Sequence, residues 1–247
     1  MLIGLGIALI AILFGGSQSN LLFTEIDSYV KKNVDDKERK ELVLSEIKAV
    51  KKLQKNYQKK TKKFTKEMGR LINNHATTKE EFDTYFATVV DFERETDAVL
   101  IPKRIFVQNT LTQQEWDEIL MAAKKKINKN NKSNDKSLKS VRKALDKLEQ
   151  DILKHTDETN KKEVLSILAD FDEKFYNYCE DVVNYDDTDA KTLRDKNATE
   201  EDLLEVVRKN NNKWIELFDI YSNLHGDLVK VIPEDKWKAV AKQLNKL

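Results

Sequence analysis

The stretch TKEEF, residues 78–82, and its counterpart TEEDL, residues 199–203, decide the predicted fold. In each, a threonine is followed three residues later by a carboxylate, which is the spacing of a capping box at the start of a helix. The two stretches lie 121 residues apart. Each therefore predicts the first turn of a helix, and their spacing indicates an internal repeat.

The same spacing relates residues on both sides of these helix starts. Tyr57 matches Tyr178, and Trp116 matches Trp237, which pairs two of the three tryptophans without a gap. Near the beginning a spacing of 122 fits better and places Val30 on Ile152. We expect a duplication, and the alternative is that two unrelated helical bundles share only their apolar patterning.

Glycine and proline are too rare for a protein made of strands and hairpins. Four of the six glycines fall within the first sixteen residues, and the only prolines are Pro102 and Pro233. Strands need turn residues far more often than this, so the sequence predicts an all-α fold. Pro102 should kink its helix or break it near Ile101. The predicted helices span 20–33, 36–73, 79–109, 113–129, 136–155, 158–190, 200–231 and 234–246.

These helices predict a chain of four parts. Residues 1–23 form a transmembrane anchor or a signal peptide, and 24–127 form the first antiparallel helical bundle. A polar linker with no apolar face covers 128–136, and the second, tandem bundle covers 137–247.

The chain begins with an apolar segment, LIGLGIALIAILFGG, from Leu2 to Gly16. As a helix it would span about 22 Å, short of the roughly 30 Å hydrocarbon core, but residues 21–23 extend it to a full span. We expect an uncleaved single-pass signal anchor, with the helical domain outside the cytoplasm. A cleaved signal peptide is the main alternative, because small residues follow the apolar run; a buried helix is a third. No cysteine follows the run, which excludes a lipoprotein.

Charge is segregated between the two predicted halves. The stretch KKLQKNYQKKTKKFTKEMGR, residues 51–70, carries nine Lys and Arg and one Glu, whereas residues 172–191, 121 positions later, carry seven acidic residues and two lysines. We expect these helices to attract each other, within one chain or between copies. The alternatives are a solvated face, or a basic helix that binds an external anion such as anionic lipid or, less in keeping with its composition, nucleic acid. The candidate interaction residues are Lys59, Lys60, Lys62, Lys63, Lys66, Asp186, Asp187 and Asp189.

No motif for catalysis, a cofactor or a metal is found in the sequence. The histidines are scattered, without metal-ligand spacing, and the repeat places His225 opposite Arg104 rather than opposite another histidine. Cys179 lies among aromatic residues at helical spacing, which predicts a buried apolar filler. Asn210 and Asn211 interrupt an apolar stripe and are expected to be solvated. We therefore predict a protein that is not an enzyme and has no cofactor.

One short motif suggests an alternative role. LTQQE at 111–115, echoed by IPEDK at 232–236, resembles the paired LTxxQ motifs of small periplasmic helical stress chaperones and metal sensors, with Glu115 and Lys236 in place of the glutamine. The resemblance implies an extracytoplasmic chaperone or sensor. The sequence as a whole favours a membrane-anchored adaptor, scaffold or accessory subunit that binds a protein partner or itself through its charged helices.

Overall fold

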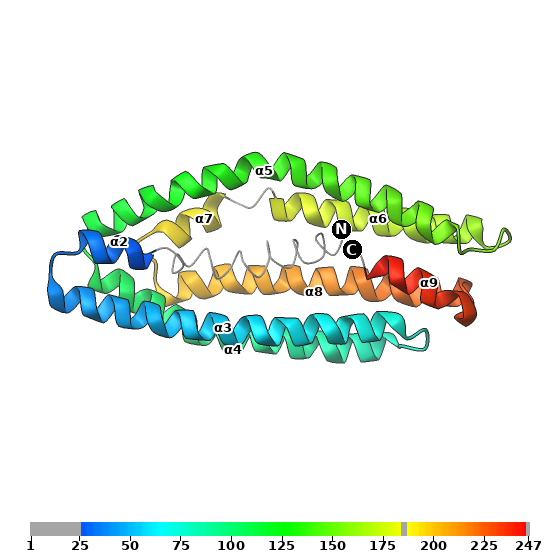
Figure 1. The fold of residues 1–247 in the computed structure, drawn as a ribbon, viewed down its shortest axis with the longest axis horizontal. Helices are drawn as coiled ribbons and strands as arrows, with labels where there is room; N and C mark the ends of the chain where they lie inside the picture. Colours follow the sequence, from blue (N-terminus) through cyan, green and yellow to red (C-terminus); the bar gives the residue numbers. More distant parts are fainter. Residues whose placement is uncertain (1–25, 184–186, 246–247) are drawn as a thin grey trace.

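The computed structural model describes residues 26–183 and 187–245. These residues form an elongated bundle of α-helices and contain no strand, so the all-α prediction is confirmed for them (Figure 1). The predicted anchor over residues 1–23 lies outside the described residues. The helices are α2 (Ile26–Asn33), α3 (Lys37–Asn73), α4 (Lys79–Thr110), α5 (Gln113–Leu153), α6 (Lys161–Val183), α7 (Asp187–Arg194), α8 (Glu200–Val231) and α9 (Glu234–Leu244).

Three long helices begin with the capping boxes that the sequence predicts. Thr78, Thr112 and Thr199 each accept a hydrogen bond from the backbone N–H three residues on, and the acidic side chain at that position accepts one from the threonine N–H. These reciprocal bonds satisfy two donors that a helix start leaves unpaired. The caps explain why the predicted starts of α4, α5 and α8 agree with the structure.

Two helix boundaries differ from the prediction. The expected linker over 128–136 lies inside α5, which is one continuous helix. That segment contains no Gly or Pro, and its Asn, Lys, Ser and Asp residues carry only small helix penalties. α4 continues through Pro102, in agreement with the predicted range 79–109, so the alternative of a break near Ile101 does not occur. The helix predicted over 158–190 is represented by α6 and α7, with residues 184–186 outside the described part.

α4 and α8 share the most extensive contact of the bundle. α8 runs along the middle of the bundle, and α4 lies behind α3 in this view (Figure 1). α3 packs on α4, α6 packs on α8, and α5 covers α6. The short helices connect the outer layers: α9 contacts α3 and α5, α2 also contacts α3 and α5, and α7 packs on α8. The order of layers is therefore α3, α4, α8, α6 and α5.

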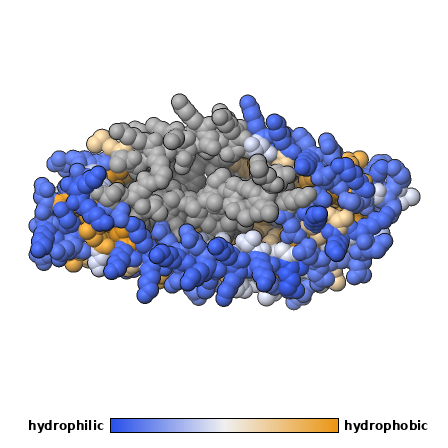
Figure 2. Space-filling model, viewed as in Figure 1, coloured by the Kyte–Doolittle hydropathy of each residue, from blue (hydrophilic) through white to orange (hydrophobic). Residues whose placement is uncertain are grey.

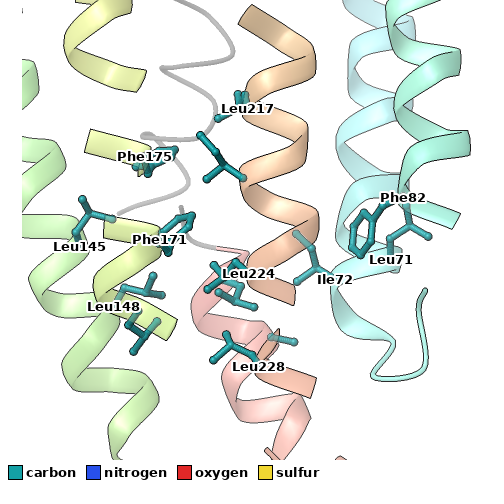
Figure 3. Packing of buried hydrophobic residues seen from close by; sticks show 14 of the residues in the cluster. Leu71, Ile72, Phe82, Leu145, Leu148, Phe171, Phe175, Leu217, Leu224 and Leu228 are labelled. Carbon is teal, nitrogen blue, oxygen red and sulfur yellow. The ribbon is translucent and has the colours of Figure 1, made fainter. Parts of the chain in front are cut away.

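The larger hydrophobic cluster joins residues from both predicted halves. Leu71 at the end of α3 and Phe82 at the start of α4 belong to the same cluster as Leu148 of α5, Phe171 of α6 and Leu224 of α8 (Figure 3). Because this core needs side chains from both halves, the halves are not two separate tandem bundles. The expected division at 128–136 is replaced by one bundle whose halves interleave.

The second hydrophobic cluster also joins the two predicted halves, with the contributions of the halves exchanged. Leu193 at the end of α7 and Leu203 near the start of α8 are buried with Val43, Leu100 and Trp116 of the first half. The apolar side chains that flank each hairpin turn are thus buried by elements of the other half. Residues 121 apart in the sequence occupy corresponding places in the two clusters, as a duplication predicts.

Two tryptophans each form one hydrogen bond that connects the two halves. Trp116 Nε1, at the start of α5, donates to the backbone oxygen of Arg194 at the end of α7 (2.9 Å). Trp237 Nε1, in α9, donates to the backbone oxygen of Ile72 at the end of α3 (3.0 Å). Each indole therefore satisfies a carbonyl that the helix end would leave without a partner.

We predict that Trp116→Phe and Trp237→Phe each lower the free energy of unfolding by about 1–3 kcal/mol, because a buried carbonyl loses its partner. Urea unfolding of the full chain in detergent, followed by far-UV circular dichroism, measures the change. Each variant should shift one common transition, since each core contains both halves. The control Ile215→Ala, at an exposed site, should change stability by less than about 0.5 kcal/mol. Two separate transitions, with each variant moving only one, would contradict the interleaved core.

Candidate functional site

The outer side of α3 is lined with lysines. The buried residues of this helix include Val43, Ile47, Val50, Tyr57 and Leu71, which are separated by four, three, seven and fourteen residues and so lie on one side of the helix, facing the core. The opposite side is exposed and almost entirely basic over its central part. We call this surface the basic face of α3; it consists of Lys48, Lys52, Lys55, Lys59, Lys62, Lys63 and Lys66.

No carboxylate among the described side chains forms an ion pair with a lysine of the basic face. The chain has no Asp or Glu between Ile47 and Lys66, and hydrophilic side chains follow the edge of the bundle where α3 runs (Figure 2). Neighbouring cations are paired: Lys103 of α4, for example, lies 2.6 Å from Glu46. The basic face therefore has positive charge that the described part of the protein does not balance.

Lys60 differs from the other four lysine candidates. Its ammonium lies 4.2 Å from the centroid of the Phe92 ring on α4, which is a cation–π contact. Lys59, Lys62 and Lys63 have no such contact among the described residues and remain exposed. Lys60 thus serves the contact between α3 and α4, while Lys66 and the other candidates stay available on the outer surface.

The three predicted acidic contact residues differ in their surroundings. Asp186 lies outside the described residues, and Asp187 begins α7, with its side chain not described. Asp189 is only 6 % exposed and accepts a hydrogen bond from Lys209 of α8 (3.0 Å). Asp189 therefore has a cationic partner inside its own half and is not an open contact residue.

The basic and acidic segments lie on different sides of the bundle. α3 packs mainly on α2, α4 and α9, whereas α6 packs on α5 and α8. α8 runs between α3 and α6 (Figure 1). The attraction expected between them within one chain is not found in the described residues. The reason is that α8 supplies cations to its own neighbours: Lys209 reaches Asp189, and Lys213 reaches the backbone oxygen of Asp181 (3.4 Å). Contact between copies stays a prediction.

A buried acidic cluster that the sequence did not suggest lies at the centre of the bundle. The Tyr57 hydroxyl of α3 donates to Glu93 Oε1 of α4 (2.6 Å), and one turn further along α4, Asp97 is hydrogen-bonded to Asn211 of α8. Glu93 is 3 % exposed, Asp97 5 % and Asn211 6 %. The expectation that Asn211 is solvated is wrong, because a carboxyl at the α4–α8 contact holds its amide.

Burial is the largest influence on the pKa values of the two carboxyl groups in this cluster. It raises the pKa of Glu93 to about 8, with a smaller contribution from the neighbouring Asp97. It also raises the pKa of Asp97 to about 7, against the opposing effect of the Asn211 hydrogen bond. At pH 7 Glu93 is therefore mainly protonated and Asp97 about half protonated, because burial in an apolar core favours the neutral form. Two acids beside each other on a helix resemble a surface feature in the sequence, and only the contacts with α3 and α8 reveal their burial.

The residues that the repeat places opposite each other, Arg104 and His225, are both fully buried. Arg104 lies over the Trp116 ring at 4.0 Å and donates to Gln108 Oε1 and to the backbone oxygen of Leu193. It thus places a cation at the carboxyl end of α7, where the helix dipole favours one. His225 lies edge-on to Trp237, and burial lowers its pKa to about 4. Both side chains support the turn between hairpin helices rather than reach solvent.

The remaining candidates for chemistry are also in the core. Cys179 is 1 % exposed and burial raises the pKa of its thiol to about 12, so the prediction of a buried filler is confirmed. Within the described ranges, no three His, Cys, Asp or Glu side chains are grouped so that they could hold a metal ion. Glu115 of the LTQQE motif closes a capping box and pairs with Arg39 (2.8 Å), which gives this motif a structural role.

Comparison with protein-family models, with curated proteins and with solved structures gave no match.

We predict that the stability of the protein falls as the pH rises from about 4 to about 8. The folded-state pKa values of Glu93 and Asp97 lie above their ordinary values of 4.5 and 3.8, so the folded state binds more protons in this window. In the double variant Glu93→Gln, Asp97→Asn, both groups stay neutral, so the fall in stability that they cause should disappear. The lowered pKa of His225 acts in the opposite direction below about pH 6 and should remain in the variant. At pH 8 the variant should be more stable by about 1.4 kcal/mol for each unit of pKa shift removed.

Urea midpoints at pH 5 and pH 8 measure this effect. The matched control is Glu95→Gln, which changes an exposed carboxylate on the same helix and should keep the wild-type pH profile. A wild-type protein that gains stability between pH 5 and pH 8, relative to the double variant, would show that the two carboxyls are ionised in the folded state.

Proposed function

We propose that the protein is a non-catalytic, membrane-tethered helical scaffold or accessory subunit, and that the basic face of α3 is a contact surface. The observation that carries the proposal is the set of seven exposed lysines without a carboxylate partner among the described residues. Like charges held side by side on a rigid helix repel one another. A binding partner with negative charge would relieve that repulsion.

The repeat supports this assignment, on the inference that the chain is a duplication. α8 provides Lys209 and Lys213 to the acidic segment that it covers. At the matching positions α4 has Thr88 and Phe92, which offer no carboxylate to α3. In the second half α8 thus pairs with one carboxylate of the acidic segment, Asp189, whereas the first half leaves the lysines of the basic face for another molecule.

The tether is inferred from the sequence. Within the described ranges, no helix is both long and apolar enough to cross a membrane. The apolar run over residues 2–23 ends four residues before Asp27, and Asp27 pairs with Lys51 of α3. A membrane anchor there would hold the bundle close to the bilayer.

The buried groups support a role that does not involve catalysis. Tyr57, Glu93 and Asp97 are the closest association of titratable side chains at the bundle centre, and each is at most 5 % exposed. Their hydrogen-bond partners are other side chains of the core. A substrate would have to separate α4 from α8 to reach them.

A second candidate, the extracytoplasmic chaperone or sensor, is favoured by one observation. Leu42 of α3 and Phe106 of α4 are exposed to 45 % and 40 %. Leu42 lies one turn before Glu46 on α3, and Phe106 lies about one turn after Lys103 on α4. Glu46 and Lys103 form an ion pair, and because α3 and α4 run antiparallel, both apolar side chains flank that pair on the same side. Such an apolar surface could hold unfolded segments of other proteins.

We predict that the protein stays in the membrane pellet after extraction with alkaline carbonate, because residues 2–23 cross the bilayer. Mass spectrometry of the same material should give the mass of all 247 residues. A mass lacking the apolar segment, with release into the supernatant, would identify a cleaved signal peptide and remove the tether from the proposal.

The two candidate functions predict different behaviour after solubilisation. A scaffold should co-purify in mild detergent with a membrane protein at a fixed ratio. A chaperone should instead suppress the aggregation of unrelated unfolded proteins, and Leu42→Ser with Phe106→Ser should weaken that effect. Suppression of aggregation without a stoichiometric partner would favour the chaperone over the scaffold.

A further inference from the structure

We infer that the basic face of α3 lies against anionic lipid headgroups, so that the bundle rests on its side on the membrane. This inference rests on the proposed tether and names the partner of the surface described above. The face has the required charge, and the fold places it beside the point where the chain leaves the predicted anchor.

The connection between the anchor and α3 is short. Asp27, in the first turn of α2, pairs with Lys51, which lies just before Lys52 of the basic face. From Phe23, the last residue of the predicted anchor, to Asp27 is four residues, which reach at most about 14 Å. Lys51 must therefore lie within about two Debye lengths of the headgroups at physiological salt, where lysines are attracted by anionic lipid.

The attachment point indicates a side-on orientation. α3 runs along the bundle for 37 residues, and Lys51 lies about 21 Å from its beginning and about 33 Å from its end. A tether at the tip of the bundle would let it stand upright. A tether partway along its flank brings the long side of α3 to the surface instead.

The shape and composition of the face suit a lipid surface better than a nucleic acid. Lys48 and Lys66 lie about 27 Å apart along one helix, which gives a row of charges for a flat surface. The aromatic residues of this segment, Tyr57 and Phe64, are packed into the larger hydrophobic cluster. They cannot serve as stacking platforms for bases, which single-stranded nucleic acid binders use.

Lysine acetylation of the full-length protein in vesicles tests the inference. One vesicle contains phosphatidylcholine alone, and the other also contains phosphatidylglycerol. Lys139, Lys143 and Lys147 of α5 are the internal controls, because they are exposed and α5 forms the opposite edge of the bundle (Figure 1). Mass spectrometry should show Lys59, Lys62 and Lys66 modified at least about fivefold more slowly in the anionic vesicles, with the controls unchanged. High salt should remove the difference.

A matched pair of variants separates charge from folding. One variant carries Lys59→Gln, Lys62→Gln and Lys66→Gln together. Its remaining basic-face lysines should lose about as much protection from acetylation in anionic vesicles as high salt removes. In the control Lys139→Gln, Lys143→Gln, Lys147→Gln, protection of α3 should remain. Equal modification of α3 in both vesicles, or equal protection of α3 and α5, would overturn the inference. Protection that depends on a retained acidic protein would overturn it as well.

Vesicle flotation distinguishes failure of the lipid contact from failure of the membrane tether. Flotation with both lipid compositions and no protection of α3 leaves the tether intact and rejects the lipid contact. Flotation only with the anionic vesicles, together with protection of α3, supports the lipid contact and rejects the anchor. A protein that floats with neither composition rejects both.

Discussion

α4 and α8 pack against each other along the centre of the bundle, and this contact places every other helix. Phe86 stacks on Phe218 with ring centroids 3.9 Å apart, and Asp97 meets Asn211 further along, so the two helices run antiparallel. α3 and α6 then pack on the outer sides of the pair, α5 covers α6, and the short helices α2 and α9 lie nearer the ends. Because hydrophobic burial is the main favourable term in folding, separating α4 from α8 would expose both hydrophobic clusters at once.

The same contact contains two buried carboxyl groups whose ionised form is unfavourable. Glu93 and Asp97 are buried between three long helices, where only the protonated form avoids a large desolvation cost. Tyr57 and Asn211 fix their orientation from either side. The centre of the bundle is thus specified by hydrogen bonds, whereas its two ends are specified by apolar packing and by the tryptophan caps on the hairpin turns.

Charge is distributed differently in the two halves. In the second half Asp189 of the acidic segment pairs with Lys209 of α8, and the first half leaves the lysines of the basic face of α3 on the surface. A tether near Lys51 would bring that surface to a bilayer and leave α5 and α6, on the other edge, facing away from it (Figure 1). On this view the membrane orients the bundle and the opposite side is free for a protein partner.

The sequence by itself determined the helices. Capping boxes and the scarcity of Gly and Pro act within a few residues, so they predicted the starts of α4, α5 and α8. The sequence also located most lysines of the basic face, because the stretch 51–70 is almost uniformly basic, but it did not separate Lys60, which contacts Phe92, from the rest. Tertiary structure alone decided that α5 continues through the expected linker, that the halves interleave, and that Asp189, Glu93, Asp97 and Asn211 are buried. Those outcomes depend on which helix lies opposite each side chain, and a contact between residues a hundred positions apart leaves no local signal in the chain.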